Sequence, residues 1–182
     1  MRVVITGGPG TGKTSIIESL EKMNFNVFNE SSREVTKKYK NNDSEQYFLS
    51  NPIDFSNILM DKRKKQFEEG SKSKNDYFFY DRGIPDILAY LNFKKIEYKS
   101  SMMKEILKFN YDAIFIAEPW EAIYTNDSER YETYNELLEI DFHIKKIYEQ
   151  LGYNIIFLPK KSVKDRVTFI LETLNWKKSV SY

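Results

Sequence analysis

The pattern G-x-x-x-x-G-K-[ST] occurs near the N-terminus of this chain, over Gly7–Thr14. Glycines in such a loop let successive backbone N–H groups point at phosphate oxygens. Its lysine brings a positive charge to the β- and γ-phosphates, and its threonine hydroxyl is placed to bind Mg²⁺. We therefore expect ATP with Mg²⁺ to be held by Gly8, Pro9, Gly10, Thr11, Gly12, Lys13, Thr14 and Ser15.

The residues on either side of this loop predict the strand and the helix that the pattern requires. Arg2–Thr6 is a short apolar run of the kind found in buried strands. After the loop, one helical face is formed by Ile16, Ile17, Leu20 and Met23. The start of that helix adds unpaired N–H groups and the positive end of the helix dipole.

Five short apolar runs alternate with helical stretches along the chain. This alternation is typical of a parallel sheet with helices on both faces. We predict an α/β P-loop NTPase fold of the kinase type with a lid, built as one domain over residues 1–182. The predicted strands are Arg2–Thr6, Phe25–Asn29, Tyr77–Tyr80, Ala113–Ala117 and Asn154–Leu158.

Helix boundary signals and two polar segments complete this prediction. A long helix should lie between Asn51 and Gly70, since Pro52 suits a first helical position. Another should run over residues 132–151, and a last one should start at Ser162. Polar residues dominate segments 41–46 and 123–130, where we expect mobile flaps.

Because parallel strands end at one edge of a sheet, their following residues should meet beside the phosphate loop. Asp81 ends an apolar strand, so it can hold Mg²⁺ together with Thr14; the alternative is a helix cap. Arg82 can contact a phosphate or a substrate hydroxyl, or form a surface ion pair. We expect Lys13, Asp81 and Arg82 to be catalytic.

Glu30 follows the second predicted strand and is a candidate general base for an attacking hydroxyl. The alternative is a carboxylate that interacts with a helix N-terminus. Arg33, one helical turn further on, is a candidate to orient Glu30 or to bind the substrate, and the alternative is a structural ion pair with a glutamate. Glu30, Arg33 and Arg82 are therefore the candidate substrate-binding residues.

Arg130 lies in the second polar segment and is a candidate catalytic residue. A flap arginine that closes over the transferred phosphate would stabilise its developing charge; the alternative is an exposed side chain.

His143 is the only histidine and falls at the edge of an apolar helix face, as a boundary residue would.

The bulk composition narrows the classes of function. The 28 Lys and Arg residues balance 27 Asp and Glu residues, so we expect no nucleic-acid partner. We interpret the basic runs at 37–38 and 62–65 as solvated helix faces. There is no cysteine, no apolar stretch long enough to span a membrane and no recognisable signal peptide, which favours a cytoplasmic protein.

The chain as a whole resembles the P-loop AAA-domain ATPase/kinase family, which includes the nicotinamide riboside kinase domain of bacterial NAD-biosynthesis regulators. It also resembles deoxynucleoside kinases. The likeness implies ATP binding, Glu30 as the base, Asp81 with Arg82 as an acidic-arginine pair, and adenine against Pro159–Arg166. The segments that carry it are Gly7–Thr14, Glu30–Arg33, Asp81–Asp86 with Tyr90, Asp127–Glu132, Gly152–Tyr153 and Leu158–Arg166.

We expect a kinase that transfers the ATP γ-phosphate to a nucleoside-like or other small-molecule hydroxyl, with Tyr47 and Phe48 as candidates for base stacking. The alternative is an ATPase or a nucleotide-dependent switch without this activity; its protein partners would be unknown. An AAA+ motor needs an acidic residue after Asp81, where this chain has Arg82.

Overall fold

The computed structural model describes residues 1–38, 47–70, 77–124 and 133–179. Five parallel strands form one sheet in the order β2-β3-β1-β4-β5. They are β1 (Arg2–Thr6), β2 (Asn26–Phe28), β3 (Phe78–Asp81), β4 (Ala113–Ile116) and β5 (Ile155–Phe157). All five predicted strands are therefore confirmed, with ends that shift by no more than two residues.

The central strand β1 is buried on both faces of the sheet. Val3, Val4 and Ile5 have no exposed surface, as expected for a strand covered by helices on both sides. In the register of β1 with its neighbours, Val4 pairs with Tyr80 of β3 and with Ile114 of β4. This alignment brings the C-terminal ends of β1 and β3 to the same edge.

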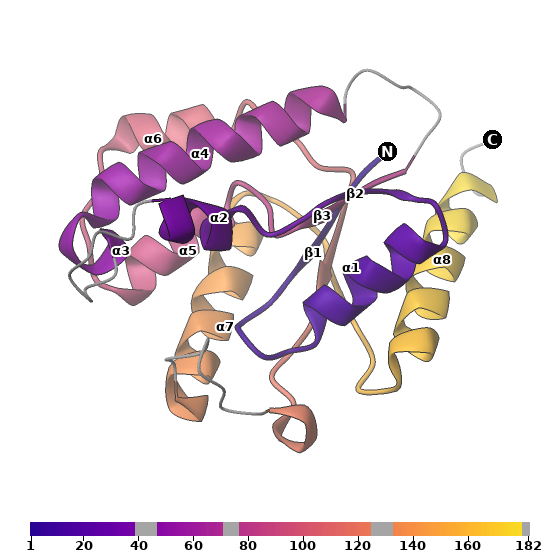
Figure 1. Ribbon diagram of the computed structural model, residues 1–182. Coiled ribbons are helices and arrows are strands. Elements are labelled where there is room, and N and C mark those ends of the chain that lie inside the picture. Colours follow the sequence, from indigo (N-terminus) through magenta and orange to yellow (C-terminus); the bar gives the residue numbers. More distant parts are fainter. Residues whose placement is uncertain (39–46, 71–76, 125–132, 180–182) are drawn as a thin grey trace.

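Helices cover both faces of the sheet, as predicted (Figure 1). α1 and α8 pack on one face against Val3, Ile5, Phe79 and Phe115. α4, α5 and α7 pack on the other face against Val4, Tyr80, Ile114 and Ile116. The helical elements are α1 (Lys13–Lys22), α2 (Ser31–Lys38), α3 (Tyr47–Ser50), α4 (Pro52–Glu69), α5 (Asp86–Phe93), α6 (Ser100–Ile106), the 3₁₀ turn η1 (Glu121–Ile123), α7 (Tyr134–Gln150) and α8 (Val163–Ser179).

Local signals fix the ends of the long helices. α4 begins at Pro52 and is followed by Gly70, as the sequence predicts. At the start of α7, Thr133 and Glu136 form a reciprocal capping box. Ser162 accepts a hydrogen bond from the Asp165 N–H at 3.2 Å, which caps α8. Ile16, Ile17 and Leu20 are buried as the predicted apolar face of α1, but the placement of Met23 on that face is wrong, since Met23 follows α1 and is 50% exposed.

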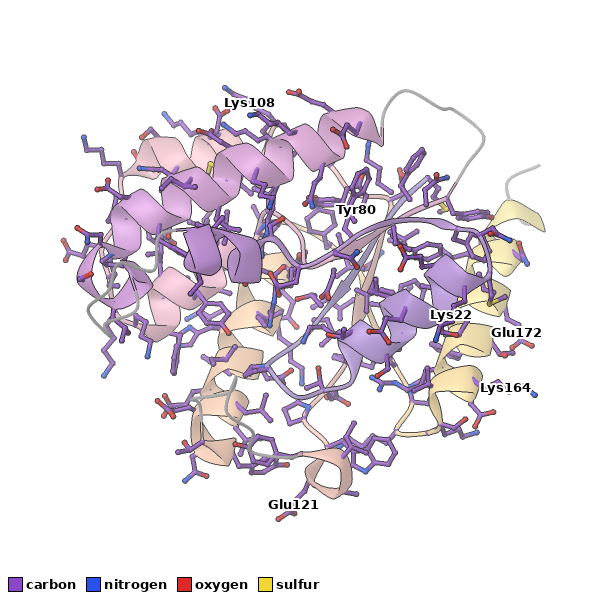
Figure 2. The ribbon with its side chains drawn as sticks, viewed as in Figure 1. Lys22, Tyr80, Lys108, Glu121, Lys164 and Glu172 are labelled. Atoms are coloured by element: carbon purple, nitrogen blue, oxygen red, sulfur yellow. The ribbon has the colours of Figure 1, made fainter. Side chains whose placement is uncertain are left out.

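Large side chains fill the space between the sheet and its helices. Figure 2 shows Tyr80 in the interior beneath α4, whereas Lys108, Glu121 and Glu172 point away from the surface. No helix in the described part of the chain is long and apolar enough to cross a membrane. The predicted flap 41–46 and most of the predicted flap 123–130 lie outside the described residues.

Candidate active site

The phosphate loop joins β1 to α1 and has the backbone conformation that its glycines allow. Gly7, Gly10 and Gly12 all have positive φ angles, of 136°, 73° and 82°. A side chain at Gly7 would also collide with the backbone, because its Cβ would lie 2.2 Å from the carbonyl oxygen of Ala117. The loop therefore needs glycine for its conformation and for its close approach to β4.

Lys13 begins α1 and is buried against its own loop. Its Nζ atom donates to the carbonyl oxygen of Gly8 at 2.6 Å and to Thr11 Oγ1 at 3.3 Å. Burial, and next the charge of Arg82, lower the pKa of Lys13 to about 7. The side chains of Thr14 and Ser15 are exposed at the first turn of the helix.

Arg166, from the first turn of α8, holds the other side of the loop. Its Nη1 and Nη2 atoms both donate to the carbonyl oxygen of Thr11, at 3.0 and 3.1 Å. The guanidinium also lies so close to Gly12 that a Cβ there would be 2.8 Å from Nη1. The resemblance alone had drawn attention to this residue, because an arginine in a helix carries no signal of its own.

Arg82 connects the phosphate loop to the edge of the sheet. It follows β3 with a φ of 73°, and it is buried, so the alternative of a surface ion pair is wrong. Its Nη1 atom donates to the Gly7 carbonyl oxygen at 3.0 Å and lies 3.4 Å from Asp86 Oδ1. Its Nε atom donates to Glu30 Oε2. The side chain thus joins the loop to the candidate base.

Glu30 lies just before α2, with its carboxylate held from three directions. Oε1 accepts from Arg63 Nη2 at 3.1 Å and from the Ser32 N–H at 3.3 Å, while Oε2 accepts from Arg82. Burial acts to raise the pKa of Glu30, but the guanidinium groups of Arg82 and Arg63 outweigh it and bring this pKa to about 2. The hydrogen bond from the Ser32 N–H is the interaction with a helix N-terminus that was considered as the alternative. Glu30 also forms ion pairs with Arg63 and Arg82, which that alternative does not include.

Arg63 corrects the interpretation of the basic run 62–65 as a solvated face. It is 3% exposed, and its Nη1 atom donates to the carbonyl oxygen of Gly83 at 2.8 Å. Lys65, by contrast, is exposed. The signal that could have found Arg63 is its position, since it continues the buried face of α4 formed by Ser56, Leu59, Met60 and Phe67.

Asp86 is a second buried carboxylate of this cluster, and the sequence suggested no role for it beyond the resemblance. It accepts hydrogen bonds from Thr6 Oγ1, from the Gly83 N–H at 2.9 Å and from the Tyr148 hydroxyl at 2.7 Å. These partners come from β1, from the turn after β3 and from α7. Asp86 therefore fixes the turn that carries Arg82.

Asp81 ends β3 and is 5% exposed. Its Oδ1 atom is buried and has no hydrogen-bond partner among the described residues. Burial, and next the negative charge of Glu30, raise the pKa of Asp81 to about 6. A buried carboxylate oxygen without a donor suits a hard cation, so the site fits Mg²⁺. The alternative of a helix cap is wrong, because Pro85 precedes α5.

Several predicted residues cannot be compared with the structure. Arg130 lies outside the described residues, and so do the side chains of Arg33, Tyr47 and Phe48, although Arg33 belongs to α2. His143 is half-buried, as predicted for a boundary residue. The described part of the site therefore consists of the phosphate loop and a cluster of six buried or half-buried charged residues: Lys13, Glu30, Arg63, Asp81, Arg82 and Asp86.

Solved structures with a similar fold include kinases of small molecules. A deoxyadenosine kinase from M. mycoides with bound dATP is 15% identical, with a TM-score of 0.69 and coverage of 96% of this chain and 100% of that one. Thymidylate kinase from Candida albicans is 15% identical, with a TM-score of 0.69 and coverage of 97% and 92%. Shikimate kinase from Aquifex aeolicus is 15% identical, with a TM-score of 0.57 and coverage of 98% of both chains.

The sheet order and the glycine loop thus define a P-loop domain of the kinase-like type. A family profile described as an AAA domain matches residues 2–166, so the chain belongs to this family. No curated protein sequence matches the chain. At identities near 15%, the solved structures establish the fold and leave the reaction to be argued from the site.

Proposed function

We propose that this protein is a kinase that transfers the γ-phosphate of ATP to a hydroxyl group of a nucleoside-like small molecule. One observation carries the proposal: Arg82 donates both to the Gly7 carbonyl of the phosphate loop and to the carboxylate of Glu30. A carboxylate so close to the loop can accept a hydrogen bond from an attacking hydroxyl.

The loop residues Gly8–Ser15 would hold the ATP phosphates through backbone N–H groups and the start of α1. Lys13 would leave its contacts with Gly8 and Thr11 and move its ammonium group onto the phosphates. This charge opposes the negative charge that develops on the transferred group.

Thr14 and Asp81 would hold Mg²⁺, which when bound screens the phosphate charges and orients them. Asp81 has the free buried oxygen for this role, and Thr14 has an accessible hydroxyl. Arg130 remains a proposed flap residue that contacts the transferring phosphate, with adenine proposed to lie near Pro159–Arg166 by resemblance.

Glu30 would orient the acceptor hydroxyl through Oε2, which has one hydrogen-bond donor, whereas Oε1 has two. Little proton abstraction is needed early in phosphoryl transfer, so a carboxylate with a low pKa can serve by accepting a hydrogen bond. The resemblances favour an acceptor with a ribose or deoxyribose hydroxyl, including nicotinamide riboside, and Arg33 stays a candidate for binding it.

The test is an ADP-release assay with Mg²⁺-ATP and a panel of nucleosides, nicotinamide riboside and nucleoside monophosphates. An acceptor that stimulates ADP release and gains one phosphate, as seen by mass spectrometry, supports the proposal. If ATP binds and no acceptor stimulates turnover, the alternative of an ATPase or nucleotide-dependent switch replaces it.

A further inference from the structure

We propose that Arg63 is a positioning residue for phosphate transfer, which keeps Glu30 aimed at the acceptor hydroxyl and fixes the turn that carries Arg82. The inference rests on the proposed function, because it assigns Arg63 a role through Glu30. It starts from three elements that this one side chain connects: α4, the residue before α2, and the turn after β3.

Two different nitrogens of Arg63 make these connections. Nη2 donates to Glu30 Oε1 at 3.1 Å, and Nη1 donates to the Gly83 carbonyl oxygen at 2.8 Å. A planar guanidinium can direct two N–H groups at two acceptors in a fixed relative orientation, whereas an ammonium group cannot. The distance between Glu30 and the Arg82–Gly83 turn is therefore set by the shape of the Arg63 side chain.

The two arginines also divide the carboxylate of Glu30 between them. Arg63 contacts Oε1, and Arg82 contacts Oε2. With the Ser32 N–H also on Oε1, the carboxylate plane is fixed and its open lone pair lies on Oε2. Without Arg63, the Ser32 N–H at 3.3 Å would be the one remaining donor to Oε1 among the described residues, so the carboxylate could rotate about its last bond more easily.

The position of Arg63 argues against a purely structural role. It lies on a face of α4 whose other buried members include Leu59, Met60 and Phe67. A guanidinium there loses its hydration, and its Nε atom is buried with no hydrogen-bond partner among the described residues. An apolar side chain would fill this position at a smaller desolvation cost, so the charge is better explained by what it contacts.

The charged groups that face Glu30 come from every element around it. Arg63 of α4 and Arg82 after β3 contact it directly, and Lys13 of α1 acts at longer range. Asp81 of β3 is the opposing negative charge, while Asp86 of α5 faces Arg82. Without Arg63, the positive charges left near Glu30 and Asp81 are Lys13 and Arg82, and Arg82 also pairs with Asp86. The pKa of Glu30 should therefore rise.

The first experiment needs no acceptor and compares the wild type, Arg63→Gln and Lys65→Gln. Lys65 belongs to the same basic run but is exposed, which makes it the matched control. The ¹³Cδ signal of Glu30, assigned by its loss in Glu30→Gln, is followed by NMR between about pH 2 and 7. We expect the wild type and Lys65→Gln to titrate at the acidic end of this range, and the midpoint in Arg63→Gln to lie about one pH unit or more higher.

The second experiment uses the acceptor found in the panel. At about pH 7.5, where Glu30 is ionised, kcat should fall in Arg63→Gln and stay at the wild-type value in Lys65→Gln, with the KM for ATP unchanged in both. Arg63→Lys keeps the positive charge and loses the two-pronged guanidinium, so we expect kcat to fall by about 10-fold or more, again with the KM for ATP unchanged. This variant also tests the inference should Arg63→Gln fail to fold.

The outcomes separate this inference from the proposed function. If the wild type phosphorylates no acceptor, the proposed function fails, while the NMR titration still reports whether Arg63 controls Glu30. If the wild type is an active kinase but Glu30 titrates identically in Arg63→Gln, or Arg63→Lys retains full kcat, the positioning role is overturned.

Discussion

The phosphate loop and the Glu30 cluster lie side by side but are built in different ways. The loop is one continuous segment whose geometry comes from its backbone, with positive φ angles at Gly7, Gly10 and Gly12. The cluster consists of side chains, because Glu30, Arg63 and Arg82 come from separate elements and meet through hydrogen bonds. The first type of site is encoded locally, whereas the second depends on the whole fold.

This difference separates two tasks of a phosphotransferase. ATP phosphates are common to all kinases, and a backbone cradle suffices to bind them. An acceptor must be recognised and aimed, and that requires side chains held in fixed positions. Substitutions in the two regions should therefore affect different kinetic parameters.

Glu30→Gln should give the largest effect and separate the regions most clearly. A neutral amide is a weaker acceptor for the attacking hydroxyl and loses both ion pairs with the arginines, so transfer should fall by about 10²–10⁴-fold. ATP affinity should stay near the wild-type value, because the loop backbone is unchanged. Single-turnover rates and calorimetric ATP binding measure the two quantities, with Glu172→Gln, a substitution at an exposed position, as the control.

A weakened ATP affinity in Glu30→Gln, with an intact transfer rate at saturating ATP, would reverse the assignment. It would mean that the carboxylate supports the loop through Arg82 and the Gly7 carbonyl.

Lys13→Ala tests the phosphate loop instead of the cluster around Glu30. The lysine should contact the phosphates more strongly as transfer proceeds, so its loss should cost about 3–4 kcal/mol in the rate. The fold should persist, because among the described residues the Lys13 ammonium group donates hydrogen bonds to Gly8 and Thr11 of its own loop and to no other element. Near-normal turnover in a protein with native circular dichroism would refute the kinase proposal.

Asp81→Asn should have opposite effects on stability and on nucleotide binding. Burial raises the pKa of Asp81 to about 6, so its carboxylate is destabilising at pH 7, and a neutral amide should stabilise the fold by about 1–3 kcal/mol. Because the folded wild type takes up this proton first, the advantage should shrink as pH falls from 7 toward 4. The amide is also a poorer ligand for Mg²⁺.

Thermal unfolding at several pH values, with and without Mg²⁺-ATP, measures both effects on Asp81→Asn. A variant that is less stable than the wild type at pH 7, or one that Mg²⁺-ATP stabilises fully, would argue against a buried metal-binding carboxylate.

Much of the fold could be predicted from the sequence, since its signals are local. The apolar run Arg2–Thr6 and the boundary residues Pro52 and Gly70 correspond directly to β1 and α4. The phosphate loop was predictable for the same reason: its glycines and Lys13 are contiguous, and their spacing leaves little freedom.

Of the residues in the charged cluster outside the phosphate loop, the sequence predicts only those that directly follow a strand. Glu30, Asp81 and Arg82 follow strands, so parallel topology brings them together. Arg63 lies in mid-helix among lysines, and its inward direction depends on how α4 packs on the sheet. The contact of Asp86 with Tyr148 spans 62 residues, and nothing near either residue indicates it. Long-range pairs of this kind follow from the tertiary fold.

The smallest predicted effect is a proton taken up by the loop when ATP binds without Mg²⁺, a condition that leaves out any proton that the cation would displace from Asp81. Burial, and next Arg82, lower the pKa of Lys13 to about 7, so in the free protein this amine is partly neutral near pH 7.5. ATP phosphates favour the ammonium form, which raises its pKa on binding and draws a fraction of a proton from the buffer. The uptake should grow from pH 6.5 to 8, because only the free protein loses the proton over that range.

Calorimetry in buffers of different ionisation enthalpy measures this uptake directly. It should disappear in Lys13→Met and persist in Lys22→Met, a substitution at the exposed far end of α1. Glu30 should contribute nothing, since its carboxylate stays ionised throughout this range. Equal uptake in Lys13→Met would mean that another group binds the proton. Uptake that is lost only in Lys13→Met would show that the phosphate loop changes its charge when ATP binds, whereas Glu30 remains ionised.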